Sequence, residues 1–346
     1  MFSAPPVELH DRARILTSRA FRRLAGKTQV IVLPDNDHLA TRLTHTLEVA
    51  GVSRSIARGL GGASFLDLDL VDAIAFAHDV GHAPFGHAGE AVLARLAAEA
   101  GLGGFHHASF GVRLLGTLER DARGVPVVRS EEVLDGVLAH SKGKSGAVFA
   151  RGAALQRRST EALIVRAADL YAYASGDLDD AYRLGVFAPN ALPSRARRVL
   201  GEHGASVRTV LVERTVAATL AEPDRGIHLD DETDAALAEL RAFLYERFYE
   251  GPATREQTRF AGEVLGALWR AFERDLVGCL AAIGARIQGE RPTMRDGLDA
   301  IAGMTDRFAI AVARGLPSCK APLVAQAFPG IPGEIKLLEG GAGANP

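Results

Sequence analysis

The sequence predicts an all-α fold, and two observations predict it. Apolar residues recur at helical spacing through most of the 346 residues, and runs that alternate between apolar and polar residues are rare. Residues 29–33 are the best candidate for a strand, so we expect at most a short β-hairpin. Apart from the helices that carry motifs, the predicted helices cover residues 70–79, 90–100, 130–140, 207–221, 231–250, 256–284 (with a break) and 293–314.

The first helix with candidate site residues spans residues 41–50. Its apolar residues recur at helical spacing, and the hydroxyl of Thr41 can cap its first turn. Arg42 and His45 are three positions apart, so they lie on one face of this helix.

Three histidines and one aspartate lie at the end of the predicted helix 70–79 and in the residues directly after it. His78 and Asp79 are adjacent, and the glycines and Pro84 that follow turn the backbone, so that His82 and His87 can converge on the same space. Five of the chain's eleven histidines lie in this run or shortly after it. This clustering predicts a site rather than scattered surface histidines.

A further motif helix covers residues 160–173 and is opened by Ser159 or by the threonine after it. Asp169 lies among alanines and leucines, and Tyr173 and Asp177 follow on the same face at steps of four. A carboxylate is costly to bury unless a cation or a hydrogen-bond partner compensates its charge. We therefore expect a compensating group beside Asp169.

Four of these residues form a candidate metal site. Two imidazoles and two carboxylates would come from three separate segments, in His45, His78, Asp79 and Asp169. Mixed nitrogen and oxygen ligation suits a divalent metal, with Mn²⁺ or Mg²⁺ expected first and Fe²⁺, Co²⁺ or Zn²⁺ as alternatives. Open positions would remain for water and substrate. The simpler alternative is that the four are unrelated surface groups.

The order H…HD…D in helices resembles the HD phosphohydrolase superfamily. The flanking sequence is similar to its deoxynucleoside triphosphate triphosphohydrolase branch, the dGTPase-like proteins. The resemblance runs through residues 18–24, 27–30, 42–49, 78–90, 105–107, 168–181 and 302–308. It implies an HD-domain helical core with additional C-terminal helices. The expected units are the HD core over residues 1–200, C-terminal helices packed on it over 201–338, and a flexible tail over 339–346.

The resemblance also implies roles for individual residues. The residues that match the family's metal ligands are His45, His78, Asp79 and Asp169. Those that match its proton-transfer and charge-stabilising groups at the α-phosphate are His82, His87, Glu90 and His107. Those that match its contacts to phosphate and deoxyribose are Arg42 for the phosphate and Gln29, Tyr173 and Asp177 for the sugar. Each role has a structural alternative. The histidines and Glu90 would be loop and cap residues, Arg42 would only pair with a carboxylate, and Tyr173 and Asp177 would be a core aromatic and a surface acid.

Two positions depart from the family pattern. Leu170 stands where the family commonly has arginine or lysine, and Gly176 stands where many bacterial relatives have histidine. Loss of a cation beside the triphosphate would weaken its binding or change the preferred nucleotide.

Composition narrows the class of protein. The net charge is −2 and the pI is near 6.6, so the chain lacks the excess of positive charge that non-specific nucleic-acid binding requires. The composition therefore does not support single-stranded nucleic acid as a partner. No signal core and no apolar run of transmembrane length occur, so we expect a cytoplasmic protein without a membrane partner. Cys279 and Cys319 are far apart, which fits reduced packing residues. The basic residues 141–158 are expected to form a long mobile loop.

The reaction that the resemblance implies is metal-dependent hydrolysis of dGTP-like dNTPs to deoxynucleoside and inorganic triphosphate. Water would attack the α-phosphorus. His87 or His82, oriented by Glu90 and His107, would protonate the leaving O5′ or assist the water. We also expect a homo-oligomer (hexamer or tetramer), with an activating nucleotide as a further partner. The alternatives are an HD-type nucleotide phosphatase or phosphodiesterase, and a non-catalytic nucleotide-sensing oligomer.

Overall fold

A computed structural model describes residues 10–30, 38–141, 158–285 and 291–315. Within these ranges the chain forms helices and turns, and its β-structure is limited to two isolated bridges, Thr28–Thr41 and Arg120–Pro126. The predicted all-α fold is confirmed. The candidate hairpin at 29–33 lies only partly within the described residues. Cys319, the tail and nearly all of the basic loop at 141–158 lie outside them.

The helices fall into two groups along the chain. The first group is α1 (Asp11–Thr17), α2 (Arg19–Arg23), α3 (Arg42–Gly59), α4 (Leu68–Ala77), α5 (Gly86–Glu99), α6 (His107–Arg113), α7 (Glu131–His140) and α8 (Thr160–Arg183). The second is α9 (Ser194–Leu200), α10 (Gly204–Ala221), α11 (Asp231–Leu244), α12 (Pro252–Arg274), α13 (Leu276–Ala282), α14 (Met294–Ala302) and α15 (Asp306–Arg314).

Side-chain caps set the starts of the two motif helices. The Thr41 hydroxyl accepts a hydrogen bond from the backbone N–H of Thr44, which completes a capping box at α3. The Ser159 hydroxyl accepts one from the backbone N–H of Ala162, so α8 begins directly after Ser159. These caps fix where the helices that carry Arg42, His45 and Asp169 begin.

Two long predicted helices are interrupted. The expected break within residues 256–284 falls at Asp275, whose side chain caps α13 through the backbone N–H of Gly278. The prediction of one helix over residues 293–314 is wrong, because α14 ends at Ala302 and Thr305 caps a new helix, α15, through the backbone N–H of Phe308. Short polar side chains bond to the next helix start in preference to continuing the previous one.

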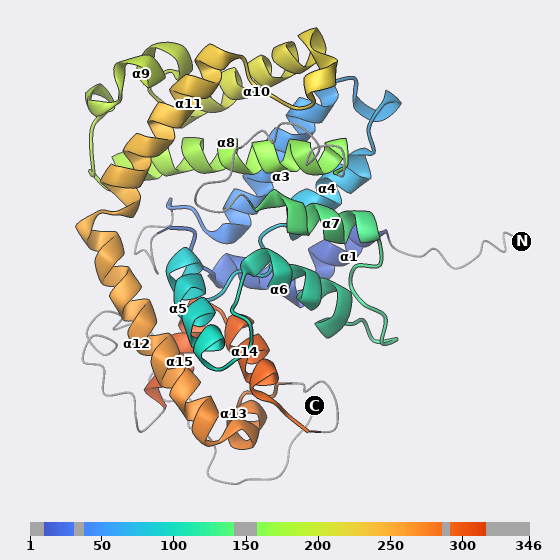
Figure 1. Ribbon diagram of the computed structural model, residues 1–346, viewed down its shortest axis with the longest axis vertical. Helices are drawn as coiled ribbons and strands as arrows, with labels where there is room; N and C mark the ends of the chain where they lie inside the picture. Colours follow the sequence, from blue (N-terminus) through green and yellow to red (C-terminus); the bar gives the residue numbers. More distant parts are fainter. Residues whose placement is uncertain (1–9, 31–37, 142–157, 286–290, 316–346) are drawn as a thin grey trace, which may run out of the picture.

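The centre of the molecule is the crossing of α3 and α8, with α4 and α7 packed beside them (Figure 1). Helices α9, α10 and α11 lie along one side of α8. The long helix α12 then leads away to α13, α14 and α15, and it packs along α5. The C-terminal helices therefore reach the segment that follows His78 and Asp79, which we call the His-Asp motif.

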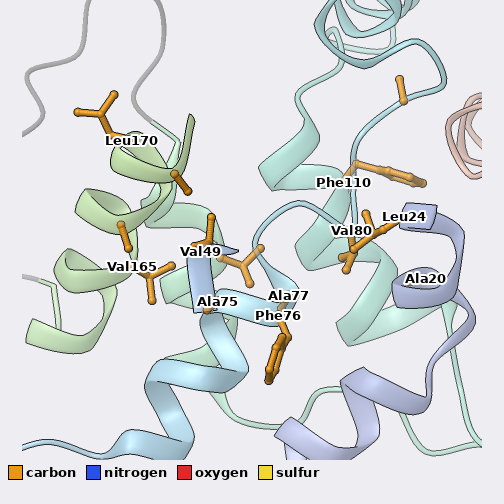
Figure 2. Packing of buried hydrophobic residues seen from close by; sticks show 14 of the residues in the cluster. Ala20, Leu24, Val49, Ala75, Phe76, Ala77, Val80, Phe110, Val165 and Leu170 are labelled. Carbon is orange, nitrogen blue, oxygen red and sulfur yellow. The ribbon is translucent and has the colours of Figure 1, made fainter. Parts of the chain in front are cut away.

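The core is continuous across these elements (Figure 2). Buried apolar side chains from α3, α4, α6 and α8 meet there, among them Val49, Phe76, Phe110 and Val165. Full burial of such a side chain stabilises the fold by about 1.5–3 kcal/mol. Leu170, the departure noted on α8, is also buried in this core, with 7% of its surface exposed. Leu170 thus contributes to the packing of the core.

None of the helices in the described part of the chain has both the length and the apolar character needed to cross a bilayer.

Candidate active site

The His-Asp motif lies where α4 ends and the backbone reverses. Helix α4 ends at Ala77, and the turn returns to helical structure at Gly86 through two left-handed residues, Phe85 with φ 64° and Gly86 with φ 58°. Gly81 is needed inside the turn, because a Cβ there would collide with the carbonyl of His107 and the backbone of Gly111. The backbone of the turn at Gly81 therefore packs directly against the backbone of α6.

Three of the four candidate metal ligands converge tightly. The ligand atoms of His45, His78 and Asp169 all lie within 4.8 Å of one another. His45 Nε2 is 3.2 Å from Asp169 Oδ1, and His78 Nε2 is 3.8 Å from the same oxygen. Asp79 Oδ2 lies 3.5 Å from His78 Nε2.

The bonding of His78 fits a metal ligand. Its Nδ1 donates to the carbonyl of Ala75 at 2.7 Å, so the neutral ring presents a lone pair at Nε2. That Nε2 is buried and has no hydrogen-bond partner among the described residues. Buried polar atoms are rarely left unpaired, and two imidazoles with two carboxylates form a suitable donor set for a divalent cation.

The groups around Asp79 hold it ionised. Burial favours the neutral acid, but the charge of Arg42 and the hydrogen bond from His82 bring the pKa of Asp79 well below its usual value. Arg42 Nη1 donates to Asp79 Oδ2 at 2.6 Å, and the arginine is fully buried. Arg42 therefore pairs with a candidate metal ligand in this structure. Its contact with phosphate stays a prediction.

A second group is organised by Glu90. Oε1 of this carboxylate accepts from the backbone N–H of His107 and from its ring Nδ1, both at 2.8 Å. Oε2 accepts from His87 Nδ1 at 3.1 Å. Burial disfavours the charged acid, yet the hydrogen bonds from His107 and His87 lower the pKa of Glu90. The Glu90 carboxylate thus holds two imidazoles beside the candidate metal ligands.

His82 joins the two groups. Its Nε2 lies 3.2 Å from Asp79 Oδ1, and its ring stacks on His107 with centroids 4.0 Å apart. Burial and the charge of Arg42 place the pKa of His82 well below its usual value, so the ring is neutral. The side chain of His87, by contrast, is 58% exposed. Of the two candidate proton donors, His87 is the one that solvent reaches.

The predicted sugar contacts lie beside the same residues. The ring of Tyr173 is 5.4 Å from His45 and 6.3 Å from His87, centroid to centroid. Burial raises the pKa of Asp177 to about 7, although a hydrogen bond from Tyr249 acts against the shift. Gln29 is buried, and neither atom of its side-chain amide has a partner among the described residues. An unpaired buried amide is costly, so Gln29 is a candidate for contact with a ligand.

Four residues at the site were not predicted to act there. Tyr249 donates to Asp177, and Lys27 donates to the carbonyls of His82 and Ala302. Asp306 accepts from the backbone N–H of Thr28 and of Phe85, each at 2.8 Å, and from the Thr28 hydroxyl.

The fourth is His140, the last residue of α7. Its Nε2 lies 3.1 Å from His107 Nε2 and 3.9 Å from Asp79 Oδ1. Burial and the nearby His78 and His107 lower the pKa of His140 to about 3. Helical spacing placed His140 at a helix end but carried no signal that this end meets α6.

The chain matches two protein families. The HD domain matches residues 42–174, and the phosphohydrolase-associated domain matches residues 227–315. The first includes every candidate metal ligand, and the second includes Tyr249 and Asp306.

Three relatives share the description deoxyguanosinetriphosphate triphosphohydrolase-like protein. The one from Desulfatibacillum aliphaticivorans is 38% identical over 306 residues, which is 87% of this chain and 84% of that protein. The one from Caldanaerobacter subterraneus subsp. tengcongensis is 38% identical over 301 residues, 87% of this chain and 81% of its own. The one from Bradyrhizobium sp. is 33% identical over 360 residues, 90% of this chain and 91% of its own. A hypothetical protein of known structure from Aquifex aeolicus aligns over 85% of this chain and 67% of its own, at 18% identity and a TM-score of 0.43.

The three relatives align over 87–90% of this chain and 81–91% of their own length. The resemblance drawn from the sequence is therefore confirmed at the level of the family. The chain is an HD-domain phosphohydrolase and belongs to the family of deoxyguanosinetriphosphate triphosphohydrolase-like proteins.

Proposed function

We propose that this protein hydrolyses deoxynucleoside triphosphates of the dGTP type to the deoxynucleoside and inorganic triphosphate, through attack of water at the α-phosphorus. One observation carries the proposal. Two buried imidazoles and a partly buried carboxylate lie beside a second group in which Glu90 holds His87 and His107. The names of the relatives support the class of substrate.

His45, His78, Asp79 and Asp169 would hold a divalent cation. We expect Mn²⁺ or Mg²⁺, with Fe²⁺, Co²⁺ and Zn²⁺ as alternatives. When bound, such a cation offsets the negative charge of the phosphates and lowers the pKa of water.

His87 is the group best placed to move a proton to the leaving O5′. Its Nδ1–H is held by Glu90, which leaves Nε2 to carry the proton that is delivered. The Glu90 carboxylate stabilises the charged imidazole before the transfer. His82 is neutral and buried, so we assign it the role of orienting Asp79 and His107 rather than of donating a proton.

Gln29, Tyr173 and Asp177 would surround the deoxyribose. If they hold the ring closely, a 2′-hydroxyl is buried without a partner, which costs on the order of 1–3 kcal/mol. Since about 1.4 kcal/mol corresponds to a factor of ten, dNTPs should be preferred over NTPs by roughly 5- to 150-fold. The subunit number, an activating nucleotide and a cytoplasmic location stay predictions.

The test is a panel of the four dNTPs and four NTPs with Mn²⁺, Mg²⁺ or Co²⁺, with products separated by ion-exchange chromatography. We expect deoxynucleoside plus intact triphosphate. We also expect the preference for dNTPs to fall in Tyr173→Ala while metal content is retained. Orthophosphate or pyrophosphate as product would favour a phosphatase or phosphodiesterase, and nucleotide binding without turnover would favour a sensing protein. Equal kcat/KM for dGTP and GTP would overturn the sugar assignment alone.

A further inference from the structure

His140 is buried among the groups of the site, yet it lies in none of the sequence motifs. It is the last residue of α7, and 2% of its surface is exposed. Its ring centroid lies 5.2 Å from that of His107 and 5.1 Å from that of His78. A buried imidazole at a helix end, next to two residues with proposed roles, requires a physical account.

The bonding of His140 fixes which of its nitrogens carries hydrogen. Its Nδ1 lies 2.5 Å from the carbonyl oxygen of Val137, which can only accept. Nδ1 must therefore be the N–H of the ring. A neutral imidazole has one N–H, so Nε2 presents a lone pair.

That lone pair faces His107. The two Nε2 atoms are 3.1 Å apart, and two lone pairs at this distance would repel. The contact is a hydrogen bond only if His107 Nε2 carries hydrogen and donates it to His140. His107 also donates from Nδ1 to Glu90 Oε1 at 2.8 Å. Both ring nitrogens of His107 thus donate a hydrogen bond, Nδ1 to Glu90 and Nε2 to His140.

The contacts form one line from α7 to the exposed edge of the site. The carbonyl of Val137 holds His140, His140 holds His107, and His107 holds Glu90 Oε1. Glu90 Oε2 in turn holds His87 Nδ1 at 3.1 Å. Rotation of His107 would therefore disturb the carboxylate that orients His87.

We infer that His140 is a positioning residue: by accepting a hydrogen bond at Nε2 it fixes the ring of His107, and through Glu90 it sets the orientation of the proton donor His87. This inference rests on the proposed function, since it concerns the same reaction. His140 touches neither the leaving group nor the phosphate in this scheme. It sets the geometry of the residues that do.

The test compares two variants of His140 with a matched control. His140→Leu removes the acceptor, and His140→Gln returns an amide oxygen at similar reach. His228→Leu is the control, because His228 is also buried and its Nδ1 also bonds to a backbone carbonyl, that of Gly226. Groups that orient active-site residues typically contribute about 10- to 100-fold.

We expect His140→Leu to lower kcat for dGTP by about 10- to 100-fold with KM and metal content close to those of the wild type. His140→Gln should recover most of this loss, and His228→Leu should show none of it. Three results would each overturn the inference: wild-type kcat in a folded His140→Leu protein, a glutamine variant as slow as the leucine variant, or metal loss in His140→Leu. The last would place a cation, rather than a hydrogen, between the two rings.

A measurement without turnover separates this inference from the proposed function. Long-range ¹H–¹⁵N spectra of ¹⁵N-histidine-labelled, Mg²⁺-loaded protein distinguish protonated from bare ring nitrogens. We expect His140 as the Nδ1–H form, and we expect His107 signals to move in His140→Leu but not in His228→Leu. A His140 ring protonated at Nε2 instead would contradict the inference. A wild type without dNTP hydrolysis would refute the proposed function and leave this readout intact.

Discussion

Residues 42–174 and residues 227–315, the two parts that match known families, contribute to the site in different ways. The first part carries the candidate metal ligands and the proposed proton-transfer residues, and some of their charges compensate one another, as those of Arg42 and Asp79 do. The second part supplies side chains that hold residues outside it in place. Asp306 accepts hydrogen bonds from the backbone of Thr28 and Phe85, and Tyr249 donates one to Asp177.

The difference shows why the site needs both parts. Phe85 is a non-glycine residue in the left-handed region, which is strained, and it lies two residues before His87. Asp306 holds its backbone N–H from α15. The C-terminal helices therefore contact the turn that leads to His87, the proposed proton donor.

The largest effect should come from the first part. Asp79→Asn keeps the shape of the side chain but removes the charge that faces His78, His82 and Arg42. We expect the fold to survive, bound metal to be lost and hydrolysis to fall to background. Metal analysis by plasma mass spectrometry, with circular dichroism as the control for folding, checks this. Full metal occupancy in the variant would remove Asp79 from the ligand set.

The next effect separates chemistry from metal binding. His87→Ala and Glu90→Ala should each lower kcat by roughly 10²–10⁴-fold while metal content and KM change little. Arg95→Ala is the control, because Arg95 lies on the same helix and pairs only with Glu99 among the contacts found for it. Wild-type turnover in both site variants would return the two residues to a capping role.

The third effect tests the hydrogen bonds from Thr28 and Phe85 to Asp306. Asp306→Ala leaves the buried N–H groups of Thr28 and Phe85 without an acceptor, at a cost of about 1–3 kcal/mol each. We also expect kcat to fall by up to roughly 10²-fold, because small displacements of a catalytic group are expensive. Stability is measured by urea unfolding and kcat with dGTP.

Asp230 provides the matched control for Asp306. It accepts from the backbone N–H and hydroxyl of Thr233, the same two groups that Thr28 offers Asp306, but it caps α11 locally. Asp230→Ala should lower stability and leave kcat unchanged. If Asp306→Ala also leaves kcat unchanged, the C-terminal helices stabilise the fold without acting on the site.

The smallest effect concerns pH and Asp177. Burial raises its pKa from 3.8 to about 7, so between those values the folded protein holds a proton that the unfolded chain releases. The unfolding free energy of the wild type should therefore fall as pH rises from about 4 to about 7, relative to Asp177→Asn.

Tyr249→Phe sharpens this result. Its hydroxyl lowers the pKa of Asp177, so its removal should extend the fall in stability to higher pH. Thermal melts of the three proteins in one buffer series check both expectations. Parallel curves for the wild type and Asp177→Asn would show that Asp177 stays ionised in the fold.

The sequence indicated the residues that converge at the candidate site better than the residues that support them. His78, Asp79 and Asp169 were found because clustered histidines and a carboxylate in an apolar helix are unusual locally. Asp306 lies 221 residues from Phe85, to which it bonds, and no local pattern indicates a contact over that separation. The continuous helix predicted over residues 293–314 hid the cap at Thr305 that positions Asp306.

Packing decided the remaining differences. Helical spacing predicted α7 and its end at His140, but the contact with His107 depends on how α6 and α7 pack. For Arg42 the sequence left a carboxylate partner open beside the expected phosphate contact, and the structure pairs the fully buried guanidinium with Asp79. The phosphate contact stays a prediction.

The most direct test of the account is hydrolysis of dGTP in H₂¹⁸O with mass spectrometry of both products. Water attack at the α-phosphorus, with cleavage of the bond to O5′, places the label in inorganic triphosphate and leaves deoxyguanosine unlabelled. The account predicts this distribution, with one ¹⁸O per triphosphate. Label in deoxyguanosine, or release of labelled orthophosphate in place of triphosphate, would contradict it.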